Sequence, residues 1–195
     1  MITVSTSKSP ARKYHHGGLR AELVAQGLRL VEQSGADAVS LREVARAAGV
    51  SPTAVYRHFP DKRALMTALA VEGTARLTAA QDAAAARESD RKAAFDATGR
   101  AYVRFALANP GLFRLIFTYP GIPLADPTRD ATVGTLHANA LELAGGNAER
   151  ARVVAVRAWA IVHGLAMLML DGRLPRDPAL VDAAIDSAAV APKPC

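Results

Sequence analysis

The chain has 195 residues, of which 50% are hydrophobic and 22% are charged, and its formal net charge is +6 at pH 7. This is enough apolar material for one small and one medium domain, each with a buried core. The single cysteine excludes an intrachain disulfide framework. Because no strand-like alternation of polar and apolar residues extends over any length, we expect an all-α fold.

The positive charge is concentrated in the first third of the chain. Residues 1–63 contain ten Lys or Arg and five Asp or Glu, whereas the other 132 residues contain 14 and 13. Such a segregated field favours binding to DNA, with an affinity that falls steeply with salt. A membrane surface would also attract it, but no predicted helix concentrates Lys and Arg opposite a bulky apolar face. Nucleic acid is therefore the preferred partner.

Residues 1–13 are rich in Ser, Thr and Lys, lack the apolar stretch of a secretory signal, and are expected to form a disordered basic arm. Two roles are open for Lys8, Arg12 and Lys13, namely insertion into a DNA minor groove or a solvated tail. The adjacent histidines at positions 15 and 16 lack carboxylate or thiolate companions at ligand spacing, so no metal site is expected.

A first helix is expected over about residues 19–32, followed by two short helices joined by a glycine turn within residues 40–62. Ser40 and Glu43 have the spacing of a capping box at the start of the first of these short helices. Gly49 ends it, since glycine adopts a positive φ without steric cost. Its apolar residues recur at helical spacing, which predicts a narrow buried face formed by Leu41, Val44, Ala45 and Ala48.

The next helix is predicted to run from Pro52 to about Phe59, with Ser51 as its N-cap and Asp61 capping the helix that follows. An ordinary helical hairpin with a solvated polar face would give a similar pattern. This helix is short for a packing element, however, and its exposed face is polar and basic. The layout favours a helix-turn-helix, whose second helix enters the DNA major groove.

The chain from about Tyr14 to Leu69 resembles the DNA-binding domain of TetR-type transcriptional regulators. The matching residues are Tyr14-His15-His16-Gly17, Gly35, Val39-Ser40-Leu41-Arg42, Ala45, Ala48-Gly49-Val50, Thr53, and the specific run Tyr56-x-His58-Phe59-x-x-Lys62. The resemblance implies that Ser40 and Arg42 lie near DNA phosphates, and that Lys62 does so from the start of the fourth helix. It implies a recognition helix carrying Ser51, Pro52, Thr53, Tyr56, Arg57 and His58. Arg57 occupies a position that varies within the family.

The remaining sequence predicts further helices with breaks at Asn109-Pro110-Gly111, Pro120-Gly121 and Gly145-Gly146. The expected ranges are 61–86 as a long connector, 90–108, 112–117, 127–144, 148–170 and 178–190. We therefore expect a basic arm at 1–13, a helix-turn-helix domain at 14–62, a helical ligand-binding and dimerisation domain at 63–190, and a flexible tail at 191–195.

Within the expected helix over 148–170, the segment 153–170 approaches the length of a membrane span. Arg157 and His163 interrupt it, which favours a buried core helix that doubles as a dimer interface. The run Trp159-x-x-x-His163-Gly164, with Asp171-Gly172 and Asn109-Pro110-x-Leu112-Phe113-Arg114, resembles the C-terminal ligand-binding domain of one TetR subgroup. The resemblance implies a homodimer on a palindromic operator of double-stranded DNA and a pocket for a small apolar or amphipathic effector.

The expected lining of that pocket is Tyr102, Phe105, Phe113, Phe117, Trp159, His163 and Met167, although aromatic residues at helical spacing also fit an ordinary core. Repression is the family's commoner outcome, and activation is not excluded. The sequence shows no targeting or membrane segment, so the cytoplasm is the expected location. Two alternatives stay open, a non-specific architectural DNA-binding protein and a helical enzyme using His163 with Asp171 or His137 with Glu142. No clustered carboxylates, phosphate loop or activated nucleophile support an enzyme, so no catalytic residue, cofactor or metal is expected.

Overall fold

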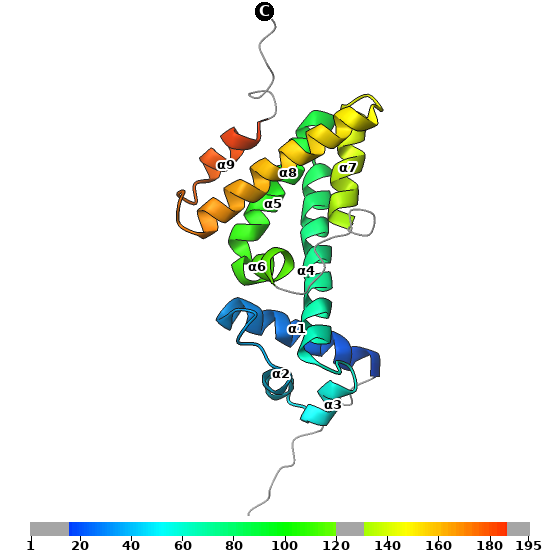
Figure 1. The fold of residues 1–195 in the computed structure, drawn as a ribbon, viewed down its shortest axis with the longest axis vertical. Coiled ribbons are helices and arrows are strands. Elements are labelled where there is room, and N and C mark those ends of the chain that lie inside the picture. The colour runs from blue at the N-terminus through cyan, green and yellow to red at the C-terminus, as the bar shows by residue number, and fades with distance from the viewer. Residues whose placement is uncertain (1–15, 120–130, 187–195) are drawn as a thin grey trace, which may run out of the picture.

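The computed structural model describes residues 16–119 and 131–186, and the regular structure within them is entirely helical (Figure 1). The all-α prediction is thus confirmed for this part of the chain. Its helices are α1 (His16–Ser34), α2 (Leu41–Ala48), α3 (Pro52–Tyr56), α4 (Lys62–Ala85), α5 (Arg91–Ala108), α6 (Pro110–Thr118), α7 (Ala131–Leu143), α8 (Ala148–Leu170) and α9 (Pro178–Ile185).

The local signals at α2 act as expected. The Ser40 hydroxyl accepts a hydrogen bond from the Glu43 amide at 3.2 Å, and the Ser40 amide donates to the Glu43 carboxylate at 3.0 Å. This reciprocal capping box satisfies backbone donors that have no partner inside the helix. Gly49 ends α2 with a φ of 67°. The predicted apolar face is buried and consists of Leu41, Val44, Ala45 and Ala48.

Helix α3 is shorter than predicted, since it ends at Tyr56 and not near Phe59. The His58 amide donates to the Val55 carbonyl, three residues back, so the last turn tightens beyond the α-helix. Pro60 then disfavours the helical conformation at the residue before it. Val55 and Phe59 are nevertheless buried, and they anchor the short helix to the rest of the domain.

Helix α4 connects the two parts of the molecule. It begins after the Asp61 N-cap, contains 24 residues, and is about 36 Å long at 1.5 Å per residue. Its first turns lie among α1, α2 and α3, and its last turns lie beside α5 and α7 (Figure 1). The prediction of a long helical connector is confirmed. Its buried side faces both parts and comprises Leu65, Met66, Leu69, Ala70, Gly73 and Leu77.

Helices α5 and α8 form the centre of the C-terminal body, with α7 and α9 on either side of them (Figure 1). Helix α9 packs on α5 through the buried Val181 and Ile185. Exposed ion pairs lie beside this contact, Asp182 with Arg104 at 3.0 Å and Asp186, directly after α9, with Lys92 at 3.5 Å. The apolar core is continuous from α1 through α4 and α6 to α8 and α9. The predicted stretches 127–130 and 187–190 lie outside the described residues.

Helix α8 has an exposed apolar side. Val153 is 51% exposed and Val156 is 57% exposed, and Trp159 follows them at three-residue spacing on the same side, whereas Ile161 and Leu168 are exposed on another side of the helix. By length and composition α8 could cross a membrane, yet it packs on α5 and α7 within the helical body and carries Arg157. Only 28% of its most apolar stretch is buried in the single chain. A contiguous exposed apolar surface of this kind is typical of an interaction site.

Candidate nucleic-acid interface and aromatic cluster

Helix α3 presents a polar surface, with Arg57 directly after it, at the end of the molecule farthest from α9 (Figure 1). Its N-terminal half is exposed, the Tyr56 side chain is 49% exposed, and Arg57 is exposed directly after the helix. Arg42 is exposed on α2, whereas His58 is only partly exposed. Of the residues predicted to contact DNA, those freely exposed are therefore Arg42, Ser51, Pro52, Thr53, Tyr56 and Arg57.

Three of the predicted contact residues also have structural partners. The hydroxyls of Ser40 and Ser51 accept hydrogen bonds from backbone amides at the starts of α2 and α3. The Lys62 ammonium donates to the Asp37 carbonyl at 2.7 Å and thereby ties α4 to the loop between α1 and α2. A lysine has three donors, so this bond leaves others for a phosphate. Phosphate contact by Lys62 stays a prediction.

Further basic residues lie beside this surface. Arg46 in the last turn of α2 and Arg63 in the first turn of α4 are exposed. The Arg20 guanidinium of α1 lies over the Phe59 ring, 5.3 Å from its centroid, which is the geometry of a cation–π contact. None of these three residues was predicted to contact DNA. Charge counting could have indicated Arg46 and Arg63, but no local pattern predicts the contact of Arg20 with Phe59.

Five of the seven predicted effector-contact residues meet in one cluster inside the C-terminal body. Tyr102 of α5 and His163 of α8 are hydrogen bonded, with 2.9 Å between the hydroxyl and Nδ1. Phe113 and Phe117 of α6 flank this pair, with ring centroids 5.7 Å and 5.3 Å from that of His163. Trp159 completes the cluster at 5.9 Å from His163. Three helices therefore supply one polar pair surrounded by aromatic rings.

Burial sets the protonation of this cluster. It lowers the pKa of His163 below its ordinary value, because the apolar surroundings disfavour the charged ring. A neutral imidazole has one donor and one acceptor nitrogen, so the ring can bind a polar group of either kind. Tyr102 is only 2% exposed, whereas Trp159 is 42% exposed. The cluster consequently reaches from the core of the body to its surface.

Phe105 and Met167 lie outside this ring cluster. Phe105 is buried in the core, and its carbonyl accepts a hydrogen bond from the Asn109 side chain at 3.0 Å. Met167 is partly buried against the same core. The predicted role of both residues in effector binding stays a prediction, and their observed contacts fit ordinary core packing.

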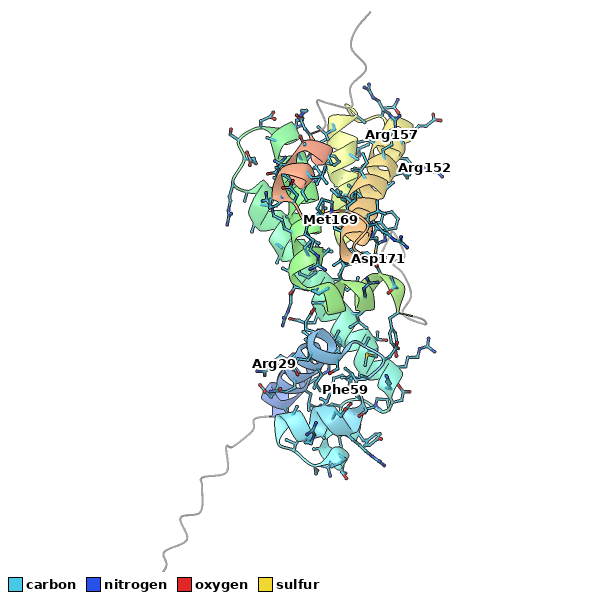
Figure 2. The ribbon with its side chains drawn as sticks, turned by 90° about the vertical axis from the view of Figure 1, so that its left-hand side faces the viewer. Arg29, Phe59, Arg152, Arg157, Met169 and Asp171 are labelled. Carbon is cyan, nitrogen blue, oxygen red and sulfur yellow. The ribbon has the colours of Figure 1, made fainter. Side chains whose placement is uncertain are left out.

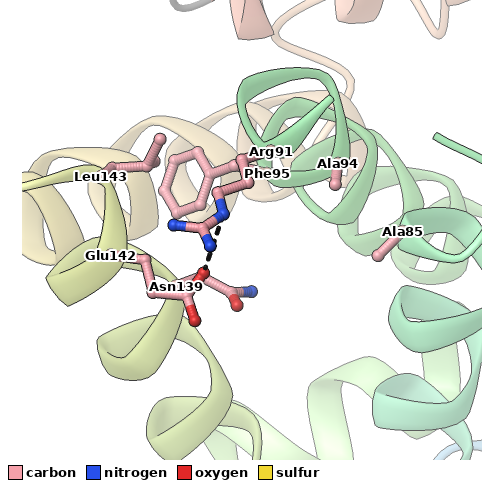
Figure 3. A pocket seen from close by; sticks show the side chains of 7 residues that line it. All are labelled: Ala85, Arg91, Ala94, Phe95, Asn139, Glu142 and Leu143. Atoms are coloured by element: carbon pink, nitrogen blue, oxygen red, sulfur yellow. Dashed lines mark ion pairs between the residues drawn. The ribbon is translucent and has the colours of Figure 1, made fainter. Parts of the chain in front are cut away.

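A small pocket of about 90 Å³ lies elsewhere, between the end of α4, the start of α5 and α7 (Figure 3). The Arg91 guanidinium and the Glu142 carboxylate form an ion pair there at 3.6 Å. Sites for drug-sized ligands measure about 300 to 1,000 Å³, so this pocket is too small for an effector. It is lined by Ala85, Arg91, Ala94, Phe95, Asn139, Glu142 and Leu143, and none of these was predicted to contact an effector.

The residue pairs of the enzyme alternative have other partners. Asp171 pairs with Arg114 and His163 with Tyr102, so these two do not form an acid–base couple with each other. Glu142 pairs with Arg91, as Figure 3 shows. Within residues 16–119 and 131–186, no group of three or more His, Cys, Asp or Glu side chains has the arrangement of a metal site. The structure gives the enzyme alternative no support.

Comparison with known families identifies the class of protein. Residues 23–69 match the model of bacterial regulatory proteins of the tetR family, and residues 95–190 match that of the tetracyclin repressor-like C-terminal domain. With the helix-turn-helix and the helical body described above, the chain belongs to the tetR family of transcriptional regulators. No curated protein shows significant similarity to it. Membership of the subgroup suggested by Trp159 and His163 stays a prediction.

Solved structures support the same fold. A Rhodococcus sp. RHA1 protein of unknown function is 37% identical with a TM-score of 0.74, covering 92% of this chain and 96% of that one. A tetR-family transcriptional regulator from Streptomyces coelicolor is 22% identical with a TM-score of 0.67, covering 88% and 79%. A TetR family transcription regulator from Marinobacter aquaeolei VT8 is 20% identical with a TM-score of 0.56, covering 87% and 92%.

Proposed function

We propose that this regulator binds a palindromic DNA operator as a homodimer and releases it when a small apolar or amphipathic effector binds the C-terminal body. Repression in the cytoplasm is the outcome we favour. The observation that carries the proposal is the exposed polar surface of α3, followed directly by the exposed Arg57, at the end of a capped helix-turn-helix. Such a helix reads base edges in the major groove, while neighbouring cations neutralise phosphates.

The exposed side of α8 supports the homodimer. Its valines and Trp159 form an apolar surface on the body, far from α3 (Figure 1). Arg152 and Arg157 project outward from the same helix (Figure 2). A second copy presents the same surface, so a two-fold axis at α8 would cover both. The two α3 helices would then read half-sites about one DNA turn apart, which requires an inverted repeat.

The aromatic cluster around His163 supports the effector site. An aromatic, largely apolar environment with one polar pair fits an amphipathic molecule whose polar group binds Tyr102 or His163. The effector must bind more tightly to the arrangement of the domains that fits the operator poorly. The effector then weakens operator binding by the same factor by which the operator weakens effector binding. Helix α4 connects the two sites covalently, and we propose that it carries this change.

The proposal is tested by selecting bound duplexes from a random DNA pool at near-physiological salt and sequencing them. We expect an enriched inverted repeat, which also supplies the probe for effector screening. Binding without enrichment would contradict sequence-specific regulation and favour the architectural alternative. The domain boundary near residue 62 remains part of the proposal, since α4 continues across it.

A further inference from the structure

The first turn of α6 lacks an acceptor from its own N-cap side chain. Helix α6 begins at Pro110, and the preceding Asn109 makes no side-chain capping bond. The side-chain amide of Asn109 donates instead to the Phe105 carbonyl at 3.0 Å, in the last turn of α5. The first amides of any helix have no acceptor within it. Those of α6 must therefore bind water or an acceptor from another part of the molecule.

Glu32 supplies the missing acceptors from α1. The Leu112 amide donates to Oε1 of Glu32 at 2.7 Å, and the Gly111 amide donates to Oε2 at 3.1 Å. Both oxygens of one carboxylate are thus engaged, and the negative charge lies at the positive end of the α6 dipole. Glu32 precedes these amides by 79 and 80 residues and lies in the last turn of α1. This cap joins the DNA-binding domain to the C-terminal body.

The backbones of α1 and α6 are in direct contact at this cap. A Cβ atom added to Gly111 would lie 2.6 Å from the Val31 carbonyl oxygen and 3.1 Å from the Glu32 Cα atom. Both neighbours are backbone atoms, which cannot move away as a flexible side chain does. Glycine at position 111 therefore permits the close approach that brings the two amides onto the Glu32 carboxylate.

The remainder of α6 contacts the candidate effector site. Phe113 and Phe117 flank His163 in the aromatic cluster, and Arg114 pairs with Asp171 at the end of α8. Helix α6 has nine residues and is about 13 Å long, so it is a short rigid element. A displacement of its aromatic face by a bound molecule must move its capped first turn as well.

From these contacts we infer that Glu32 is a positioning residue, which fixes the DNA-binding domain relative to the C-terminal body through α6. Helix α6 is then a second mechanical connection beside α4, and it transmits changes in the aromatic cluster to α1. The regulatory consequence rests on the proposed function. The positioning itself rests only on the cap and on the close approach at Gly111.

The positioning is tested by a distance measurement that requires neither DNA nor effector. Spin labels are attached at Ala47→Cys on α2 and Ala138→Cys on α7, both exposed, in a Cys195→Ser chain diluted with unlabelled protein. We expect Glu32→Ala to shift or broaden the distance distribution measured by pulsed electron paramagnetic resonance. Glu32→Gln keeps one acceptor oxygen and should give a smaller change. Gln33→Ala, at the exposed neighbouring position, should give none. An unchanged distribution in Glu32→Ala would overturn the inference.

Transmission is tested by a double-mutant cycle on the selected operator. Arg114→Ala breaks the tie of α6 to α8, and Glu32→Ala breaks its tie to α1. We expect each change to weaken operator binding. The double variant should bind the operator no more weakly than the weaker of the two single variants, so that its dissociation constant differs by about 2-fold to 100-fold from the value expected if the two effects multiplied. Effects that simply multiply would overturn transmission through α6. If no duplex is selected, the proposed function fails, while the distance measurement still decides the role of Glu32.

Discussion

Helices α3 and α8 both leave a large surface uncovered in the single chain, and the chemistry of the two surfaces is opposite. The exposed side of α3 carries hydroxyl, phenol and guanidinium groups, with Thr53, Tyr56 and Arg57 as its projecting side chains. The exposed side of α8 carries Val153, Val156 and Trp159. Polar and cationic groups bind DNA edges and phosphates, whereas an apolar surface is stabilised by a second apolar surface.

The difference indicates two partners with separate roles, DNA at α3 and a second copy of the chain at α8. Neither surface can take the place of the other, because DNA offers no large apolar surface and a second copy of α3 would repel the first by its charge. The α8 surface fixes the number of copies, and the α3 surface fixes the sequence that they bind. Changes on α8 should therefore remove operator binding altogether, and changes on α3 should alter its selectivity.

The largest expected effect is from Val156→Glu. Two like-charged carboxylates would be desolvated near each other in the proposed dimer, at a cost of about 3 to 5 kcal/mol, or a factor of more than about 100 in the dimer dissociation constant. Analytical ultracentrifugation measures that constant. Val71→Glu is the matched control, since Val71 is 66% exposed on α4, outside the α8 surface. Equal dimerisation of the two variants would contradict the assignment of α8.

A smaller effect is expected from Arg57→Ala on α3. Loss of one base contact should cost about 1 to 3 kcal/mol on the preferred operator and relax selectivity at one position of each half-site. Arg42→Ala should instead weaken binding to every duplex alike and reduce the salt slope by about 1. Titration of both variants against the operator and a scrambled duplex at several salt concentrations separates the two roles. Identical behaviour of the two variants would count against this separation.

A local effect on stability is expected from Ser40→Ala. The substitution removes the acceptor for the Glu43 amide and one partner of the Glu43 carboxylate. Loss of an N-cap costs about 1 kcal/mol, so the free energy of unfolding should fall by about that amount in chemical denaturation. Ser34→Ala at the end of α1, where Ser34 is exposed, is the control. If both changes were neutral, the capping box would have no energetic role.

The smallest expected effect is a pH dependence from His163. Burial lowers the pKa of His163 in the folded chain. Above the unfolded pKa of about 6.5, the ring is neutral in both the folded and the unfolded chain. Below that value the unfolded chain takes up the proton first, so the free energy of unfolding decreases as the pH is lowered. His163→Gln should flatten this decrease, whereas His137→Gln at an exposed position should not. Denaturation midpoints between about pH 7 and pH 5 measure the difference. An unaltered pH profile in His163→Gln would remove His163 as its source.

The sequence predicted those parts of the fold that depend on neighbouring residues. The capping box at Ser40, the positive φ at Gly49 and the bounds of α8 follow from signals within a few residues of each helix end. The end of α3 was placed too late, because the His58 amide binds the Val55 carbonyl three residues back. Residue spacing before Pro60 does not distinguish this tightened turn from a further α-helical turn.

The candidate sites also contain parts that could be predicted from the sequence and parts that could not. The resemblance predicted five residues that the fold brings into one cluster around His163, although they come from three helices. It could not show that the Lys62 ammonium binds the Asp37 carbonyl, or that Glu32 caps α6. These bonds join segments 25 and 80 residues apart. Each depends on the packed arrangement of whole helices, which neither spacing nor composition determines.

The most direct test of this division of labour is the mass of the complex formed with the selected duplex. Native mass spectrometry would compare the full inverted repeat with a duplex that contains one half-site and a scrambled second half. The account predicts two chains on the full repeat, and much weaker binding to the single half-site. One chain per full repeat, or equal affinity for both duplexes, would contradict a dimer joined through α8 that reads DNA through two copies of α3.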